Sequence, residues 1–427
     1  MSSKSKNKIS SVEGMQDILP QSERLWKVIN EKGKEVSELH DFHLMETPVF
    51  EQKSLYDRAY DEDTLLSQES LINGRLDTVD SPISLRPDGK IPVMRSYLEN
   101  QLGYYFSPLR AYYHGPAFRK DRDNKENSHD RFHEWGFEII GDGDPIYDVE
   151  IVSVMVSFLE ALQIKDPVLR ISAVGCKSCR PKYKEELKDY YRYRTKKLCE
   201  DCSDYFKESP IKLLTCEVEE CGELQEQAPI IFDHLCDECN EHFKELLELI
   251  EDNDVNYVPD PYVIGELGFY SRVAFKVSAR EEGEALGYGG RFDNLARSIG
   301  NRSLESVGGS FEIEKIIKEL KERDVDLKSQ RDKRREVFFI AVGRKARKSA
   351  LSIMNELRNT KIVVMEALGR ETLEKQLKYA KKSGAPLSLI YGRKEVFEES
   401  VLIREMDSGN QESVLLDDML DEVRKRL

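Results

Sequence analysis

The sequence has no apolar run that approaches the length of a membrane-spanning helix, and a chain without such a run has no helical way to cross a bilayer. Its first residues, MSSKSKNKISS, are polar and basic with no apolar stretch behind them, which also argues against a secretory signal peptide. We expect residues 1–11 to form a disordered tail, and we expect a cytoplasmic protein that does not bind a membrane.

A surplus of positive charge is also missing. The 427 residues carry a formal net charge of -15, which argues against a general affinity for nucleic acid, although a local basic face is compatible with that total. Hydrophobic residues make up 39% of the chain and charged residues 34%, the balance of a soluble, charge-rich globular protein. The length allows about two to four domains.

Cysteine is absent outside one segment, and within it all eight cysteines come as four pairs. Two thiolates a few residues apart on a tight turn can bind one tetrahedral ion, and a second pair completes a four-ligand shell. Disulfides are the competing interpretation, but a chain without a secretion signal is expected in a reducing compartment. We therefore predict structural zinc, and the pattern leaves open which pairs share an ion; the candidate ligands are Cys176, Cys179, Cys199, Cys202, Cys216, Cys221, Cys236 and Cys239.

Hydrophobic periodicity divides the chain into several parts. Helix and strand signals are mixed in residues 12–167 and again in 260–325, on either side of a largely helical, cysteine-bearing segment at 168–259. Residues 326–335 are charged and poor in apolar side chains, the composition of an exposed linker. In residues 336–427, apolar runs such as VFFIAVG and PLSLIYG alternate with helix-patterned segments, which predicts a small α/β domain with a mainly parallel sheet. The expected fold class is α+β.

Several stretches, taken in order, resemble the bacterial histidyl-tRNA synthetase family, which belongs to the class II aminoacyl-tRNA synthetases. METPVFE is similar to motif 1, GPAFRKDR with RFHEWGFEIIG to motif 2, and SVGGSFEIEKI to motif 3. GMQDILP, SLRPDGKIPVMRSY, GYGGRFDNL and GRETLEKQLKYAKKSGAPLSLIYG also resemble family stretches, so the likeness covers nearly the whole chain.

The resemblance implies an antiparallel class II core, a cysteine-rich insertion domain and a C-terminal anticodon-binding domain, assembled as a homodimer. The family reaction joins histidine to the α-phosphate of ATP and then moves the acyl group to the 3′ end of its tRNA. Histidine, ATP with Mg²⁺ and tRNA are therefore the implied small molecules and partner. Catalysis of this kind depends on positioning and on charge stabilisation by particular cations and carboxylates.

Motif 2 is partly retained. Arg119 falls on the arginine that in the family grips the α-phosphate, a task suited to a guanidinium fork. Asp121 stands where the family has glutamate at the nucleotide site. The loop that follows is slightly longer than usual and contains Asp123, Glu126 and Asp130, and this dilution of positive charge should weaken contacts to tRNA phosphates.

The implied histidine pocket departs further from the family. Asp88 replaces a glutamate, Lys90 a threonine, Glu134 a glutamine and Phe292 a tyrosine. Several simultaneous changes to the polar groups that recognise one ligand should cost much of its affinity. The full set of substrate-binding candidates is Asp88, Lys90, Glu134, Glu138, Tyr270, Arg291 and Phe292.

Two further departures affect the catalytic cations. Gly265 stands at the position of the family's catalytic arginine, and the motif 3 arginine is Lys315, which keeps the charge but loses the planar fork. Glu312 stands at a family glycine beside the nucleotide, where its carboxylate would oppose a polyphosphate, unless it faces solvent on a helix. Loss of a transition-state contact of the arginine type typically costs several kcal/mol.

These departures favour a histidyl-tRNA synthetase homologue in which aminoacylation is impaired. An active histidine–tRNA ligase with a divergent pocket is the alternative, supported by Arg119, Glu138 and Arg291. A non-catalytic tRNA-binding or regulatory paralogue, or a ligase for another substrate, are further alternatives. The regulatory subunit of ATP phosphoribosyltransferase is a precedent for a non-catalytic relative, but it usually lacks the C-terminal domain that this chain has.

Overall fold

A computed structural model describes residues 9–60, 63–64, 70–77, 80–120, 130–216, 218–264, 268–325, 336–369 and 372–427. The chain divides into two compact units, Met1–Leu327 and Lys328–Leu427, which are described separately. The division falls within the predicted linker, residues 326–335, which lies outside the described residues, as does most of the predicted N-terminal tail. Among the described residues, no helix is long and apolar enough to cross a membrane.

The first unit is built on an eight-stranded sheet with the order β1-β5-β6-β11-β10-β9-β7-β8. The six central strands pair antiparallel, and each two- or three-residue edge strand pairs parallel to its neighbour. This confirms the predicted antiparallel core. The strands are β1 (His43–Leu44), β5 (Leu109–Phe118), β6 (Arg131–Ile140), β7 (Val168–Gly175), β8 (Tyr257–Pro259), β9 (Ser271–Ser278), β10 (Ala285–Arg291) and β11 (Ser306–Glu312).

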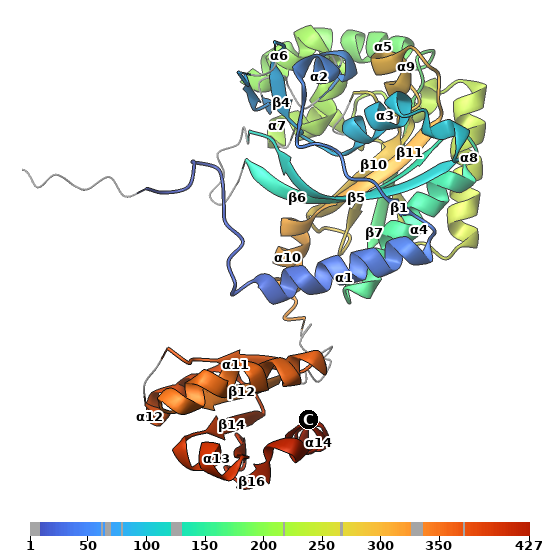
Figure 1. Cartoon of the computed structure of the whole chain (residues 1–427). Helices are drawn as coiled ribbons and strands as arrows, with labels where there is room; N and C mark the ends of the chain where they lie inside the picture. Colours follow the sequence, from blue (N-terminus) through green and yellow to red (C-terminus); the bar gives the residue numbers. More distant parts are fainter. Residues whose placement is uncertain are drawn as a thin grey trace, which may run out of the picture. The chain divides into compact units, whose positions relative to one another are not determined.

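Helices cover both faces of this sheet (Figure 1). One face packs against α1 (Glu23–Leu39), α4 (Ile146–Ala161), α8 (Asp237–Asp252) and α10 (Ile313–Glu322), with a core that includes Trp135, Phe137 and Phe158. The other face packs against α2 (Lys53–Ala59), α3 (Lys90–Glu99) and α9 (Leu295–Gly300). Because side chains alternate along a strand, the neighbours of Trp135 and Phe137 in β6 face this second side. A small three-stranded sheet is formed by segments that flank α2 and precede α3 in the sequence: β2 (Phe50–Gln52), β4 (Ile83–Leu85) and β3 (Asn73–Gly74).

The cysteine-bearing segment is helical, as expected. It contains α5 (Arg180–Arg192), α6 (Glu200–Glu208) and α7 (Glu219–Gln225), joined by short 3-10 turns, and it continues into α8. Its own apolar cluster includes Tyr183, Leu187 and Tyr191 together with Cys202 and Cys221. The segment therefore has an interior of its own within the first unit.

The second unit has a five-stranded sheet with the order β13-β12-β14-β15-β16. β12 pairs parallel with β13 and β14, whereas β14, β15 and β16 pair antiparallel. The expectation of a mainly parallel sheet is therefore wrong for half of the ladders. β14 and β15 pair antiparallel although a short helix connects them, and β15 and β16 are joined by a tight turn in which Gly409 has a φ of 75°. The elements are β12 (Glu336–Ala341), α11 (Arg344–Asn359), β13 (Val363–Glu366), α12 (Leu373–Ser383), β14 (Leu387–Tyr391), α13 (Arg393–Glu398), β15 (Ser400–Glu405), β16 (Gln411–Leu415) and α14 (Met419–Arg426).

Candidate active site and metal centres

A narrow cavity of about 30 Å³ lies on the second face of the large sheet. Strand register explains why its side chains meet there, since Glu134 of β6 lies opposite Glu312 of β11, and Tyr288 of β10 lies opposite Ser310. Residues directly opposite on neighbouring strands point to the same face. The lining residues are Asp88, Lys90, Arg119, Phe132, Glu134, Tyr270, Tyr288, Ser310, Phe311 and Glu312.

The ammonium group of Lys90 lies inside this cavity. Lys90 is the first residue of α3 and only 3% of its surface is exposed. Its Nζ donates a hydrogen bond of 2.6 Å to Ser310 Oγ, which in turn donates one of 2.8 Å to Glu134 Oε1. The second carboxylate oxygen of Glu134 accepts a 2.8 Å hydrogen bond from the backbone N–H of Gly89. A lysine, a serine and a carboxylate therefore form one continuous buried chain.

Two further carboxyl groups surround the same cation. Asp88 is 4% exposed, and its Oδ1 accepts a 3.0 Å hydrogen bond from the N–H of Ile91. Glu138 is fully buried, and both of its carboxyl oxygens lack a hydrogen-bond partner among the described residues, as does Asp88 Oδ2. Burial, followed by the neighbouring Glu134, raises the pKa of Asp88 to about 6. Burial also raises the pKa of Glu138 well above the ordinary glutamate value.

The charge of Lys90 is stabilised by these neighbours. Burial alone would lower the pKa of the ammonium group, but the phenol of Tyr270 and the surrounding carboxylates raise it overall. Desolvation of an isolated cation is costly, so a buried lysine stays charged only when opposite charges lie close by.

The implied nucleotide side of the cavity is defined by Arg119 and Glu312, both of which line it. Arg119 follows the end of β5, and its guanidinium carbon lies 4.4 Å from the ring centroid of Phe132. Glu312 is partly exposed, and its carboxylate lies 3.5 Å from the ammonium group of Lys315. Lys315 also lies 3.7 Å from Glu284, so two carboxylates compete for this cation.

Some predicted residues lie elsewhere. Arg291 is fully buried, where it pairs with Asp148, lies 3.5 Å from Asp293 and donates a 2.8 Å hydrogen bond to the backbone carbonyl of Asp142. Phe292 is also fully buried, and its ring contacts Phe269 at 6.1 Å. Both residues are therefore part of the protein interior, and neither lines the cavity. Gly265 and Asp121 lie outside the described residues.

The cavity also includes residues that the sequence analysis did not name: Phe132, Tyr288, Ser310 and Phe311. Two of them carried a usable signal. Ser310 lies two residues before Glu312 in the same strand, and therefore on the same face, and Tyr288 precedes the paired glycines of GYGG.

The eight cysteines gather into two separate clusters. The outer cluster joins the first and last pairs, Cys176, Cys179, Cys236 and Cys239, and the inner cluster joins the middle pairs, Cys199, Cys202, Cys216 and Cys221. In each cluster all four sulfur atoms lie within 4.8 Å of one another, and none of the eight forms a disulfide.

The spacing of the sulfurs fits a tetrahedral ion. The Sγ–Sγ distances are 3.6 Å for Cys176–Cys179, 3.8 Å for Cys176–Cys236 and 3.8 Å for Cys199–Cys216. Four thiolates at about 2.3 Å from a central zinc would lie roughly 3.8 Å apart. Backbone N–H groups also donate to these sulfurs, for example from Cys236 to Cys179 at 3.1 Å, and such donation favours the thiolate form. The clusters could therefore hold metal ions.

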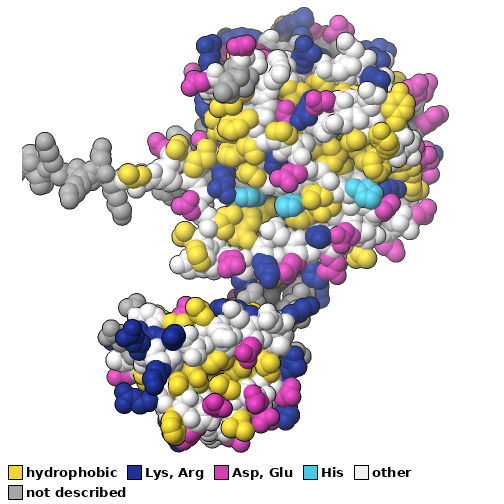
Figure 2. All heavy atoms as spheres, viewed as in Figure 1, with side chains coloured by type: hydrophobic (Ala, Val, Ile, Leu, Met, Phe, Trp, Pro, Cys, Tyr) yellow, Lys and Arg dark blue, Asp and Glu magenta, His cyan; other side chains and the backbone are white. Residues whose placement is uncertain are grey.

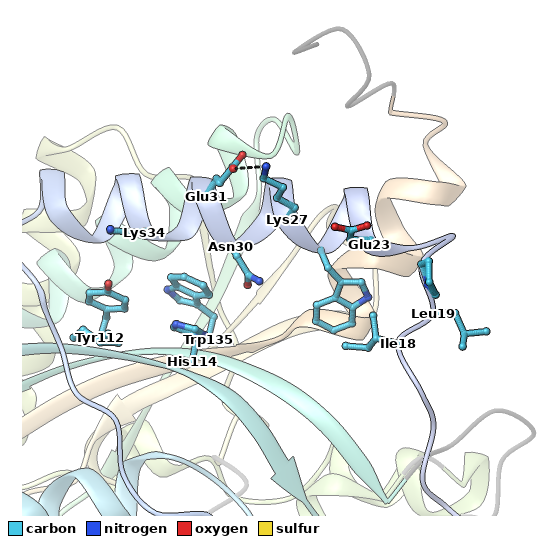
Figure 3. A pocket seen from close by; sticks show the side chains of 13 residues that line it. Ile18, Leu19, Glu23, Lys27, Asn30, Glu31, Lys34, Tyr112, His114 and Trp135 are labelled. Atoms are coloured by element: carbon cyan, nitrogen blue, oxygen red, sulfur yellow. Dashed lines mark ion pairs between the residues drawn. The ribbon is translucent and has the colours of Figure 1, made fainter. Parts of the chain in front are cut away.

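A larger, open groove of about 680 Å³ lies on the opposite face of the sheet (Figure 3). Tyr112, His114 and Trp135 rise from the sheet toward α1, with Ile18 and Leu19 at one end. The His114 and Trp135 rings are stacked with their centroids 4.7 Å apart. This groove is separate from the charged cavity because alternate residues of β6 face opposite sides.

The antiparallel sheet, its charged cavity and the separate C-terminal unit together define a class II aminoacyl-tRNA synthetase fold. The histidyl-tRNA synthetase family matches residues 14–316, and an anticodon binding domain matches residues 336–426. The chain belongs to the histidyl-tRNA synthetase family.

Named relatives and solved structures agree with this assignment. The chain is 33% identical over 414 residues to the histidine–tRNA ligase of Pseudothermotoga lettingae, covering 96% of this chain and 94% of that protein. It is 31% identical over 415 residues to the ligase of Natranaerobius thermophilus, covering 96% and 98%. The apo histidyl-tRNA synthetase of S. aureus has a TM-score of 0.79 at 25% identity, covering 98% of this chain and all of that one. The synthetase from Nostoc, at 17% identity and a TM-score of 0.66, shares the fold.

Proposed function

We propose that this chain is a histidyl-tRNA synthetase homologue in which ATP-dependent activation of histidine is impaired. The main observation in support of this proposal is that the buried ammonium group of Lys90 occupies the carboxylate-lined cavity. In effect, the chain supplies its own cation where an amino-acid ligand would bring its α-ammonium group.

The size of the cavity supports this proposal. Ligand pockets commonly enclose about 300–1,000 Å³, whereas this cavity measures about 30 Å³. A ligand would have to displace Lys90 from Ser310 and the carboxylates, which means breaking a buried, hydrogen-bonded cation away from its partners. The cost of that displacement would be subtracted from the affinity for any amino acid.

The nucleotide side adds a second obstacle. Glu312 lies directly opposite Glu134 in the sheet register, so both carboxylates line the cavity together with that of Asp88. Lys315, in place of an arginine, is shared between Glu312 and Glu284. We infer that a polyphosphate would meet more negative charge and less directed positive charge here than an arginine-based site would provide.

Histidine-dependent exchange between ATP and pyrophosphate tests the proposal directly. We expect the wild-type chain to be slower than an ordinary synthetase of the family by at least a factor of about 100, as expected for loss of one charge-stabilising contact. Lys90→Thr combined with Glu134→Gln should open the amino-acid side, and Gly265→Arg with Glu312→Gly and Lys315→Arg should restore the nucleotide side. The five substitutions together should recover measurable exchange.

The second candidate is an active histidine–tRNA ligase with a divergent pocket. Arg119 lines the cavity, the buried Glu138 interacts electrostatically with Lys90, and the match to curated ligases spans almost the whole chain. Exchange at the rate of an ordinary synthetase would establish this candidate and overturn the impaired one. If exchange is absent but tRNA binds, the non-catalytic binding role is favoured.

Binding of tRNA by the second unit has a specific basis. At the start of α11, Arg344, Lys345, Arg347 and Lys348 are all exposed, and Figure 2 shows Lys and Arg side chains gathered on one part of this unit. A local cluster of cations can bind phosphates even on a chain with negative net charge. We propose this helix end as part of the tRNA contact.

A homodimer is supported by the apolar groove and its surroundings. Figure 2, seen from the side on which α1 and β1 lie in Figure 1, shows hydrophobic side chains gathered across the first unit. Leu44 lines the groove and is 53% exposed, and Tyr104 and Tyr105 are nearly four-fifths exposed. Large exposed apolar surfaces mark association sites. We propose that a second copy of the chain covers this groove. The cytoplasmic location of the protein stays a prediction from the sequence.

Zinc is the metal that fits the two cysteine clusters best, because four thiolates in a tetrahedral shell are typical of structural zinc. We propose one zinc ion in each cluster. ATP and Mg²⁺ would be needed only for the catalytic reaction.

A further inference from the structure

The outer cysteine cluster begins where a central strand of the sheet ends. β7 finishes at Gly175, which is followed directly by Cys176 and which pairs with Arg272 of β9. Gly175 has a φ of 65°, and a Cβ added there would lie 2.8 Å from the Cβ of Cys179. A glycine is therefore required for the close approach of the cluster to the strand. The cluster is thus fixed to the same part of the sheet that carries the cavity wall.

Arg180 connects the cluster to the cavity wall through hydrogen bonds. It is the first residue of α5 and directly follows Cys179. Its guanidinium donates to the backbone carbonyls of Val174 at 3.1 Å, Gly268 at 2.8 Å and Tyr270. Tyr270 lines the cavity. One guanidinium therefore holds both the end of β7 and the residues that lead into β9.

Neighbouring polar groups keep this arrangement in place. Asp63, which is 8% exposed, lies 3.7 Å from Arg180, pairs with Lys184 of α5 at 2.7 Å and accepts a 2.5 Å hydrogen bond from Ser209. The N–H of Gly268 donates to Thr64 Oγ1 at 3.2 Å. The start of α5 is consequently anchored on one side by the cysteines and on the other by a buried carboxylate.

The inner cluster has a different set of neighbours. The N–H of Cys199 donates to Cys221 Sγ at 3.3 Å, and the side chain of Gln225 donates to the carbonyls of Cys216 and Leu213. These contacts stay within the cysteine-bearing segment. The inner cluster therefore serves as a matched control for the outer one, with the same ligand chemistry and a different position.

We propose that the outer cluster, when it holds zinc, is a positioning element for the wall of the ligand cavity and acts through Arg180. This inference rests on the proposed zinc sites but not on the level of catalytic activity. The metal fixes the turn from Cys176 to Cys179, the turn fixes the first residue of α5, and Arg180 fixes the carbonyls of Gly268 and Tyr270. Arg180 is a positioning residue, since it holds backbone and does not reach the reacting groups.

The test measures zinc content and amide hydrogen exchange on the full chain. Three variants are compared with the wild type: Cys176→Ser with Cys239→Ser in the outer cluster, Cys199→Ser with Cys221→Ser in the inner cluster, and Arg180→Lys. We expect two zinc ions per chain in the wild type and in Arg180→Lys, and one in each cysteine variant. Amides at Tyr270, Ser271 and Val273 should exchange at least about tenfold faster in the outer variant and in Arg180→Lys, since the guanidinium hydrogen bonds to the carbonyls of Gly268 and Tyr270 are lost or loosened. In the inner variant they should match the wild type.

Each contrary result has a defined meaning. A wild-type chain without bound zinc would overturn both the zinc proposal and this inference. Suppose that the wild type holds two zinc ions but that the amides of the cavity wall exchange equally fast in the inner and outer variants. Loss of either metal would then loosen the whole unit, and only the proposed link between the outer cluster and the cavity wall would be overturned. Wild-type exchange in Arg180→Lys would also overturn it, and this variant keeps the cysteines, so misfolding of the cysteine variants does not hide the answer.

Discussion

Among individual side chains, Lys90 is the buried cation around which the acids of the cavity gather. Three carboxyl groups, of Asp88, Glu134 and Glu138, share the neighbourhood of one buried cation. Removing the cation from such a buried cluster would leave its carboxyl groups without a compensating charge, which typically costs about 3–5 kcal/mol. The pocket therefore resists small changes and would have to be rebuilt by several substitutions together.

The raised pKa of Asp88 gives the protein a predictable response to pH. The carboxyl group has a pKa of about 6 in the folded chain against an ordinary value of 3.8, so folding favours its protonated form. The stabilisation that the protonated Asp88 carboxyl group gives the folded state is fully present below about pH 4 and is lost as the pH rises through about 6. Asp88→Asn should therefore gain stability relative to the wild type across this window, by about 2–3 kcal/mol, measured by urea unfolding.

Asp77→Asn is the matched control, because Asp77 is exposed and a surface change of this kind should stay within about 0.5 kcal/mol at every pH. The prediction fails if the stability curves of the wild type and Asp88→Asn run parallel between about pH 4 and pH 6.

For single residues, the sequence showed which side chains belong to the site more reliably than it showed which contacts they make. Asp88, Lys90 and Glu134 could be named because they lie within recognisable stretches, where Lys90 and Glu134 change the charge and Asp88 shortens a carboxylate side chain. The hydrogen bond between Lys90 and Ser310 could not be foreseen, because it joins residues 220 positions apart and depends on the register of β11. Arg291 has a charge that suggests ligand binding, but its position beside Asp148 gives it buried partners within the protein.

Among the elements, helix α1 lies close to the sheet because of one glycine. A Cβ added at Gly33 would lie 2.6 Å from Cζ2 of Trp135, nearer than two carbon atoms can approach. Gly33→Ala should therefore lower the free energy of unfolding by up to about 2 kcal/mol, since an overpacking cost of about 1–3 kcal/mol is offset by a gain in helix propensity of only about 1 kcal/mol. Thermal and urea unfolding would measure the change.

Gly222 in α7 supplies the opposite case. A Cβ at Gly222 would meet nothing within 4 Å, so Gly222→Ala should raise stability by about 0.5–1 kcal/mol. If both variants change stability in the same direction, the close packing of α1 is not the cause.

Element types were predictable from periodicity, whereas partner choice was not. Alternation along Arg131–Ile140 indicates a strand with two different faces, and the structure has such a strand. The pairing of cysteines could not be derived from spacing, because the first pair shares its cluster with the last pair in the sequence and not with the pair that follows it. The mixed sheet of the second unit depends on the strand directions after α13 and after the tight turn between β15 and β16, which apolar runs do not reveal.

At the scale of the whole molecule, the proposed homodimer gives a direct prediction. Leu44→Glu places a charge in the exposed apolar groove, and burying an unpaired charge costs a few kcal/mol. The dimer should therefore dissociate at a concentration at least about tenfold higher than the wild type requires, as followed by sedimentation velocity across a dilution series.

Phe397→Glu is the control, because Phe397 is 89% exposed in the second unit and its replacement should leave association unchanged. A wild-type chain that is monomeric at all concentrations would refute the proposed second copy, and equal effects of both variants would show that the groove is not the interface.

The nested arrangement of the cysteine clusters also sets an order of assembly. In the inner cluster Cys199 and Cys216 are 17 positions apart, whereas in the outer cluster Cys176 and Cys236 are 60 positions apart. Chain-closure entropy makes the longer loop harder to close by about 1 kcal/mol when the chain between is unstructured, but prior folding of the inner module shortens the span that remains. During synthesis the outer cluster has to wait until Cys239 has left the ribosome. The wall of the ligand cavity would then become fixed late, after the inserted segment has folded.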